Sequence, residues 1–257
     1  MPLQLHSFEW SDASRHAFAL LKARPLRWLA WTLCTLVVVE SLTFVPYVGF
    51  LLKLGLASLL FGQWMLAFAD VDVGRAPDPR ILLRAFAQPF AVQWAVIVAG
   101  VAPFVVSVGV LATVADGWTT MGFFFGHMTR GAAPGPVATF GFKVLMAALG
   151  AMLVFVPGFA VLTGVGGVAA IGAALRAVAI NRRPVLLLFG VTVALEAAQI
   201  ALTSAPLPVA LTVSIVLLLA YLPWSIAIAY AGSIRALDDR PGGIPAGRES
   251  GRTVDRR

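Results

Sequence analysis

Six stretches of about 20 apolar residues constrain the fold of this chain more than any other feature. They are residues 26–45, 48–69, 91–114, 142–162, 184–203 and 207–234. An α-helix of about 20 mainly apolar residues crosses the hydrocarbon core of a bilayer. Overall, 60% of the 257 residues are hydrophobic and 12% are charged, against roughly 25% charged in soluble domains. A water-soluble fold could not bury this much apolar surface. The sequence therefore predicts an all-α membrane protein with six transmembrane helices.

The apolar segment 139–180 is long enough to leave the number of crossings open. We favour one crossing, then a turn at 163–167 ("TGVGG"), then an amphipathic helix. Arg176, Arg182 and Arg183 suit a headgroup surface better than the middle of a membrane. Two crossings over this segment are the alternative.

The placement of basic residues supports six helices rather than seven. Of the 19 Lys and Arg residues, all but three lie at one of four places. These are the segment before the first helix together with that helix's first turn, the segments after the second and fourth helices, and the segment from the end of the sixth helix onward. Lysine and arginine in short loops mark the cytoplasmic side, so both termini are expected in the cytoplasm. The other three, Lys53, Arg130 and Lys143, lie at or near the expected outer loops. Residues 1–24 are polar and amphipathic, so we expect no cleavable signal peptide there.

We expect a single transmembrane domain over residues 1–237, followed by a tail. The tail, 238–257, is rich in Arg, Gly and acidic residues and has little apolar content, which predicts a disordered basic cytoplasmic segment. The expected outer loop, 115–139, is rich in glycine and aromatic residues. Within it, Trp118 and Phe123–Phe125 suit the membrane interface, where aromatic rings are enriched.

A half-apolar basic segment, a proline and an apolar span recur three times. The three copies are "AFALLKARPLRWLAW" (17–31), "RILLRAFAQPFAVQWAV" (80–96) and "LRAVAINRRPVLLLFGV" (175–191). Proline ends one helix but fits the first turn of the next. The sequence thus predicts three units, each an amphipathic helix in the inner interface followed by a helical hairpin. The arginines that would anchor these units to anionic headgroups are Arg24, Arg27, Arg84, Arg176, Arg182 and Arg183.

The second amphipathic segment also carries a helix-start signal. Asp78 and Pro79 precede it, and they read as an N-cap and the first helical residue.

Several segments resemble a group of bacterial polytopic inner-membrane proteins. They are "LLKARPLRW" (20–28), "VPYVGFLLKLGLASLLFGQWMLAFADVDVGRAP" (45–77), 156–191 and "LPWSIAIAYAGSIRALDD" (222–239). The group is similar to the membrane domain attached to some glycerophosphodiester phosphodiesterases. The resemblance covers nearly the whole chain and implies a multi-pass protein of the bacterial inner membrane. It implies no catalytic residues, because the chain carries no phosphodiesterase domain.

Ionisable side chains inside apolar spans are costly and therefore candidates for function. Glu40 precedes Pro46 by six residues and Lys53 follows it by seven, so both lie about 10 Å from the turn. Glu196 has a similar depth in the fifth helix, and Gln199 lies one turn further out. These four residues form a candidate intramembrane polar cluster for ion or proton coupling. A structural Glu40–Lys53 pair, or Lys53 snorkelling outward, is the alternative.

The remaining inventory argues against catalysis and cofactor binding. The single cysteine, Cys34, excludes an internal disulfide, and His6, His16 and His127 lack metal-ligand spacing. There is no nucleotide-binding loop, and basic residues flanking membrane spans do not indicate nucleic acid. We therefore expect no catalytic, metal or cofactor site, and a partnership with the lipid bilayer and its anionic headgroups. The expected role is a non-enzymatic scaffold, envelope or partner-binding protein, with a small-solute or ion permease as the alternative.

Overall fold

The computed structural model of the chain describes residues 3–45, 49–114, 136–202 and 206–237, and these ranges contain no β-strand. This confirms the predicted all-α class for the described chain. Trp118, Phe123–Phe125 and the predicted tail lie outside the described residues. In chain order the helices are α1 (Trp10–Ala23), α2 (Pro25–Ser41), η1 (Leu42–Phe44), α3 (Gly49–Asp72), η2 (Pro79–Ala87), α4 (Phe90–Val114), α6 (Pro136–Met152), α7 (Val156–Thr163), α8 (Gly167–Ile180), α9 (Arg182–Leu202) and α10 (Leu207–Leu237), where η marks a 3-10 helix.

Five segments of the described chain are long and apolar enough to cross a membrane. They are Leu51–Asp72, Phe90–Thr113, Val137–Thr163, Arg182–Leu202 and Leu207–Leu237. These segments coincide with the second to sixth predicted helices. The first predicted helix forms α2, which has 17 residues. That length rises about 26 Å, slightly less than the roughly 30 Å of a hydrocarbon core.

The first predicted helix, 26–45, extends four residues beyond the C-terminal end of α2. The α-helix stops at Ser41, whose hydroxyl donates to the Val38 carbonyl at 2.7 Å and so competes with the helical backbone bonds. The chain then makes the short 3-10 helix η1 and becomes extended at Val45. Pro46 follows, and a residue before proline is disfavoured in the α conformation.

The fourth predicted helix, 142–162, is divided in two. α6 ends at Met152, a turn covers 153–155, and α7 begins at Val156. Pro157 lies in the first turn of α7 and has no N–H to continue the α6 ladder. α7 ends at Thr163, and its C-cap residue, Gly164, has a φ of 72°, which is readily adopted only by glycine. The region 139–180 thus contains one membrane-length segment, and the shorter α8 follows the turn predicted at 163–167.

The junction between α8 and α9 lies three residues earlier than Pro184. Asn181 is the C-cap of α8, and its side-chain amide donates to the Ala177 carbonyl at 3.0 Å. α9 starts at Arg182, with Pro184 in its first turn, where its missing N–H costs nothing. Arg182 and Arg183 therefore belong to the long helix α9 and not to the short helix before it.

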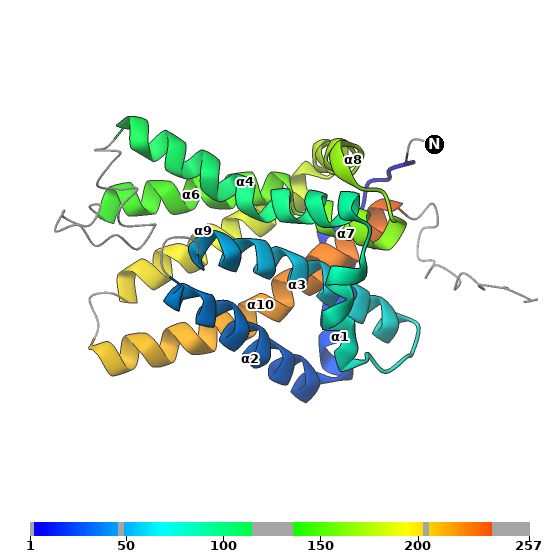
Figure 1. Ribbon diagram of the computed structural model, residues 1–257, viewed down its shortest axis with the longest axis horizontal. Helices are drawn as coiled ribbons and strands as arrows, with labels where there is room; N and C mark the ends of the chain where they lie inside the picture. Colours follow the sequence, from blue (N-terminus) through cyan, green and yellow to red (C-terminus); the bar gives the residue numbers. More distant parts are fainter. Residues whose placement is uncertain (1–2, 46–48, 115–135, 203–205, 238–257) are drawn as a thin grey trace, which may run out of the picture.

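The three short segments expected before the prolines are helical and lie at one end of the bundle. α1, η2 and α8 gather there together with the N-terminus (Figure 1). We call this the near end and the opposite one the far end. The Asp78 carboxylate accepts the Arg80 backbone N–H at 2.9 Å, which confirms the predicted N-cap. η2 is a 3-10 helix, and the Gln93 side chain caps its end by donating to the Phe86 and Gln88 carbonyls at 3.2 and 2.6 Å.

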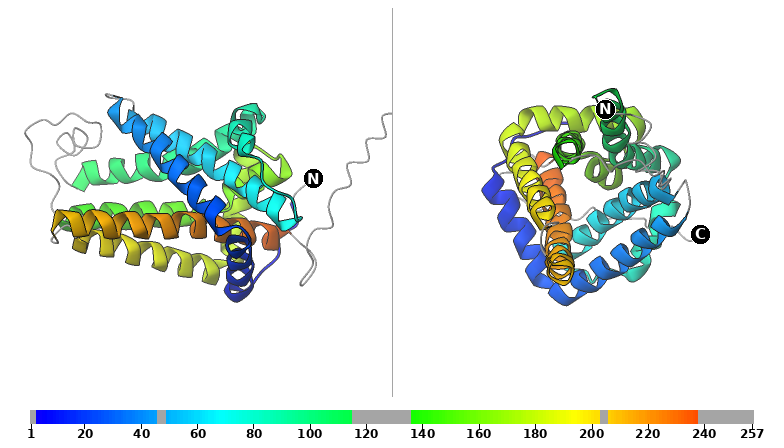
Figure 2. Two further views of the ribbon diagram at one scale, coloured as in Figure 1. Left: turned by 90° about the horizontal axis from the view of Figure 1, so that it is seen from below. Right: turned by 90° about the vertical axis from the view of Figure 1, so that its left-hand side faces the viewer.

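The long helices pack along the bundle and α8 crosses its near end. α3 packs on α4, α6 on both α4 and α9, and α10 on α9 (Figure 2). The α3–α4 contact, and a further contact between α7 and α10, bring backbones close together. A Cβ on Gly100 would lie 1.5 Å from the Ser58 hydroxyl oxygen, and one on Gly158 would lie 2.1 Å from that of Ser233. Small residues commonly allow such close packing between membrane helices.

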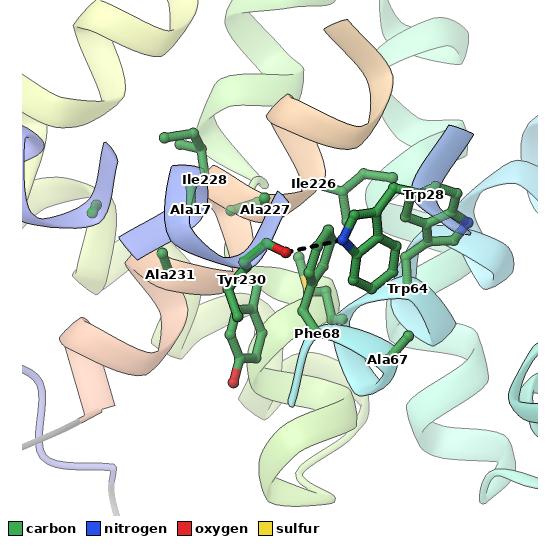
Figure 3. Close-up of a cluster of buried hydrophobic side chains, with 14 of the residues drawn as sticks. Ala17, Trp28, Trp64, Ala67, Phe68, Ile226, Ala227, Ile228, Tyr230 and Ala231 are labelled. Atoms are coloured by element: carbon green, nitrogen blue, oxygen red, sulfur yellow. Dashed lines mark hydrogen bonds between the residues drawn. The ribbon is translucent and has the colours of Figure 1, made fainter. Parts of the chain in front are cut away.

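Aromatic side chains fill the core where α1, α2, α3 and α10 meet. Trp28, Trp64 and Phe68 are fully buried and lie against one another beside Tyr230 (Figure 3). The ring centroids of Trp28 and Phe68 are 4.3 Å apart, and those of Phe68 and Tyr230 are 6.0 Å apart. Both are within the range of favourable ring contacts. The Trp28 indole N–H donates to the Leu20 carbonyl at 3.0 Å, which ties α2 to α1.

Candidate functional site

The four residues of the predicted polar cluster do not come together. Glu40 and Lys53 form an ion pair between α2 and α3, with 2.6 Å between Oε2 and Nζ. The Glu40 side chain is 58% exposed and that of Lys53 is 23% exposed. This pairing is the structural alternative that the sequence left open.

Glu196 instead forms an ion pair with Lys143 across α6 and α9. Both side chains are about three-quarters buried. Gln199 lies further along α9 and is half-buried. The expected grouping of Glu196 with Glu40 and Lys53 is therefore wrong. The sequence placed Lys143 near an outer loop because it is close to the start of an apolar span, whereas it lies inside α6.

A cavity of about 440 Å³ lies between the long helices, and the Lys143–Glu196 pair forms part of its wall. Glu40 and Lys53 do not line it. The lining comes from α2, α3, α4, α6, α7, α9 and α10, with Leu153 and Val154 of the turn before α7. Toward the far end, the α2–α3 pair diverges from the α9–α10 pair (Figure 2). The volume is in the range of small-molecule sites, roughly 300–1,000 Å³.

Small side chains create this space. Ala57, Ala99, Ala147, Gly150 and Ala151 all line the cavity. A Cβ added to Gly150 would meet nothing within 4 Å. The cavity is thus present where the facing helices contribute little side-chain volume.

The lining is mainly apolar, with a few polar groups whose bonds are made within the protein. The Thr192 hydroxyl and the Tyr221 hydroxyl lie 2.7 Å apart and share a hydrogen bond between α9 and α10. The Trp64 indole N–H donates to the Thr35 hydroxyl at 3.2 Å. Apolar sites with a few placed polar groups are typical of ligand pockets. Chemically, this arrangement suits binding of a small apolar or amphiphilic molecule.

The N-terminal segment closes the near end of the bundle. Asn181 is 2% exposed. Its side-chain oxygen accepts the Phe8 N–H at 2.8 Å, and its side-chain nitrogen donates to the His6 carbonyl at 3.1 Å. The His6 N–H donates to the Ala236 carbonyl at 2.9 Å. The segment is therefore fixed to both the α8–α9 junction and the end of α10.

A second polar cluster, not predicted from the sequence, joins α1, α3 and α10. His16 Nε2 lies 2.8 Å from Asp72 Oδ1, and the Tyr230 hydroxyl donates to Asp72 Oδ2 at 3.0 Å. The signal available in the sequence was a carboxylate at the end of an apolar span. Its partners lie 56 and 158 residues away, so spacing could not identify them.

The predicted arginine anchors occupy the near end and its surroundings. Arg27 is half-buried and donates to the Pro77 carbonyl at 3.2 Å, which ties the start of α2 to the segment before η2. Arg24 is also half-buried, at the junction between α1 and α2. The exposed anchors are Arg84, Arg176, Arg182 and Arg183.

The described residues hold no group of three His, Cys, Asp or Glu that could bind a metal ion. Cys34 is exposed on α2. No protein-family model matches the sequence, and no curated protein or solved structure matches it either. The candidate site therefore rests on the geometry of the cavity and its charged pair.

Proposed function

We propose that this chain is a six-span protein of the bacterial inner membrane with both termini in the cytoplasm. In addition to the five membrane-length segments, α2 with η1 forms one further span, the first in chain order. It packs on α3 and extends the apolar bundle. The near end, with α1, η2 and α8, is the cytoplasmic end in this proposal. It carries most of the arginines expected as anchors, in keeping with the positive-inside rule. The resemblance to the bacterial inner-membrane group supports this location.

The topology can be tested by cysteine accessibility in a background in which Cys34 is replaced by alanine. Val137 lies in the first turn of α6 at the far end, and Arg183 lies in the first turn of α9 at the near end. Both residues are exposed. We expect Val137→Cys to react with a membrane-impermeant maleimide in intact spheroplasts, and Arg183→Cys to react only after lysis. Labelling of both positions from the same side would overturn the six-span arrangement.

We further propose that the protein is a non-enzymatic membrane protein that binds a small apolar or amphiphilic solute. The cavity between the long helices carries this proposal. A bundle serving only as a scaffold gains nothing from an unfilled space, since empty volume forfeits packing energy. The cavity therefore favours the permease alternative over a scaffold. Its mainly apolar lining favours solutes over hydrated ions.

A cavity-filling variant tests this function. Gly150 lines the cavity and has open space around it, so Gly150→Leu should fill the cavity without a clash. Gly141→Leu is the matched control on the same helix, because Gly141 is exposed, has nothing within 4 Å of an added Cβ and does not line the cavity.

The readout is photolabelling by decanol carrying a diazirine on its chain, with the labelled residues mapped by mass spectrometry. In wild type and Gly141→Leu, we expect labelling of cavity residues such as Met146 and Leu188, reduced by excess unlabelled decanol. Gly150→Leu should lose this competed labelling. Labelling confined to lipid-facing residues in all three proteins would contradict solute binding and favour the scaffold role.

A further inference from the structure

We propose that the cavity selects an uncharged amphiphile with a hydroxyl-bearing head and one apolar chain. The Lys143–Glu196 pair would bind the head, and the apolar lining toward the near end would bind the chain. This inference rests on the proposed function, because it assumes that the cavity binds a solute.

Polarity changes along the cavity from the far end toward the near end. Lys143 lies seven residues after the start of α6 and Glu196 six residues before the end of α9, so both are about 10 Å from the far ends of their helices. The Thr192–Tyr221 hydrogen bond lies one helical turn deeper than Glu196. Beyond it, the lining is mainly apolar and includes Trp64, Pro157, Leu188 and Ile226. The hydroxyl of Ser225, which also lines this part, donates to the Leu222 carbonyl at 2.9 Å. A ligand that matches this gradient has a polar head toward the far end and an apolar chain toward the near end.

The length of the apolar part suits a single chain of moderate length. Along α9, the residues that line the cavity extend from Glu196 to Leu188. The eight residue steps between them correspond to about 12 Å along the helix axis. Side chains from seven helices form the wall, so the cavity is a site between helices and not a groove along one of them. One compact chain fits such a site.

The charged pair favours a head without net charge. An anionic head that approached Lys143 would also meet the carboxylate of Glu196, and a cationic head would meet the ammonium of Lys143. In this mainly apolar surrounding, like-charge repulsion and the loss of hydration are both expensive. A hydroxyl avoids both costs, because it can donate to the Glu196 carboxylate and accept from the Lys143 ammonium. The ion pair can therefore recognise an alcohol without being broken.

The test uses three probes with the same diazirine-bearing decyl chain and different heads. The heads are a hydroxyl, a sulfonate and a trimethylammonium group, so the charges of the two ionic probes do not depend on pH. For each protein in nanodiscs, labelling of the cavity peptides is measured relative to Gly150→Leu, which removes the contribution of lipid-facing residues.

In wild type we expect the alcohol probe to label the cavity about tenfold more than either charged probe. Each charged head would meet one like charge of the Lys143–Glu196 pair, and a penalty of about 1.4 kcal/mol corresponds to tenfold weaker binding. Glu196→Gln should raise labelling by the sulfonate, because Lys143 is then unpaired. Lys143→Met should raise labelling by the trimethylammonium probe, because Glu196 is then unpaired. The exchanged pair, Lys143→Glu with Glu196→Lys, should restore the preference for the alcohol, which separates selectivity from misfolding.

Equal cavity labelling by all three probes in wild type, or unchanged ratios in the two single variants, would overturn this inference while leaving the proposed binding function in place. Absence of cavity labelling by any probe in wild type would remove the proposed function and this inference together. A gain of the opposite-charge probe in each single variant, with recovery in the exchanged pair, would support it.

Discussion

The side-chain oxygen of Asn181 accepts the backbone N–H of Phe8 at 2.8 Å across 173 residues of sequence. The same side chain caps α8 through the Ala177 carbonyl and holds the His6 carbonyl. One buried amide thus closes a helix end and fixes the N-terminal segment over the near end of the bundle. Asn181, three residues before Pro184 in the sequence, therefore connects the N-terminal segment to the α8–α9 junction.

Replacing Asn181 by alanine should release the N-terminal segment. The change leaves the Phe8 N–H and the His6 carbonyl without their side-chain partner, and an unsatisfied buried group costs about 1–3 kcal/mol. We expect a lower free energy of unfolding in detergent and faster proteolysis ahead of α1. Arg182→Ala, at the exposed neighbouring residue, is the control and should behave as wild type. Equal protection of the N-terminus in both variants would contradict the tether.

Asp72→Ala should detach α1 from α3 and α10. It leaves the His16 ring nitrogen and the Tyr230 hydroxyl without their shared acceptor, for a loss of about 2 kcal/mol or more. Trypsin cleavage within α1, at Arg15 or Lys22, should become faster.

The matched control for this cluster is Asp12→Ala on α1. Asp12 pairs with Arg15, but the two side chains are 44% and 79% exposed. Such surface pairs contribute about 0–1 kcal/mol, so α1 should stay docked. Equal trypsin sensitivity of Asp12→Ala and Asp72→Ala would show that the buried cluster has no special role.

Gly158→Ala should destabilise the contact between α7 and α10. The new Cβ would lie 2.1 Å from the Ser233 hydroxyl oxygen and 2.6 Å from Ser233 Cβ, and overpacking of this kind costs roughly 1–3 kcal/mol. Ser233→Gly in the same protein should recover much of the loss, since it removes both clashing atoms. Thermal unfolding in detergent measures both effects.

Gly172→Ala in α8 provides the contrast, because nothing lies within 4 Å of its added Cβ. Alanine in a helix is favoured over glycine by about 0.5–1 kcal/mol, so this variant should be neutral or slightly stabilised. A loss as large as that of Gly158→Ala would refute close packing as the reason for glycine at position 158.

Glu40→Gln should cost about 1 kcal/mol or less, because Glu40 is one residue from the end of α2, where the Lys53 ammonium left behind can extend along its stem to water. The double variant Glu40→Gln with Lys53→Met, which removes both charges, should fold as well as the single one. Photolabelling of the cavity should also be unchanged, since neither residue lines it. A change in cavity labelling would link this pair to the site after all.

The near end illustrates what local sequence can predict. Pro25 begins α2, Pro89 directly precedes α4, and Asp78 caps η2, because proline and capping residues act on the backbone within one turn. The apolar spans also predicted the long helices, since their length and composition are local properties. Both helices end a few residues before the prolines that were expected to mark the boundaries, and side-chain bonds from Ser41 and Asn181 to the backbone occur at these ends.

The candidate site was predicted only in part. Glu40 and Lys53 lie six residues before and seven residues after Pro46, so the turn expected at this proline was enough to predict their pairing. The partner of Glu196 was not predictable in this way, because Lys143 lies 53 residues away on a helix that could face any neighbour.

The sequence by itself determined that the chain is an all-α protein with several membrane-length helices and where most of them begin. It could do so because hydropathy, proline and capping act through the local backbone. The tertiary structure alone decided that Lys143 meets Glu196, that small residues from facing helices leave a cavity, and that Asn181 holds Phe8. These features depend on how each helix is rotated and which neighbour it packs against. In this chain the long helices are apolar on nearly every side, so no stripe in the sequence fixes that rotation, and only the packing of the whole bundle does.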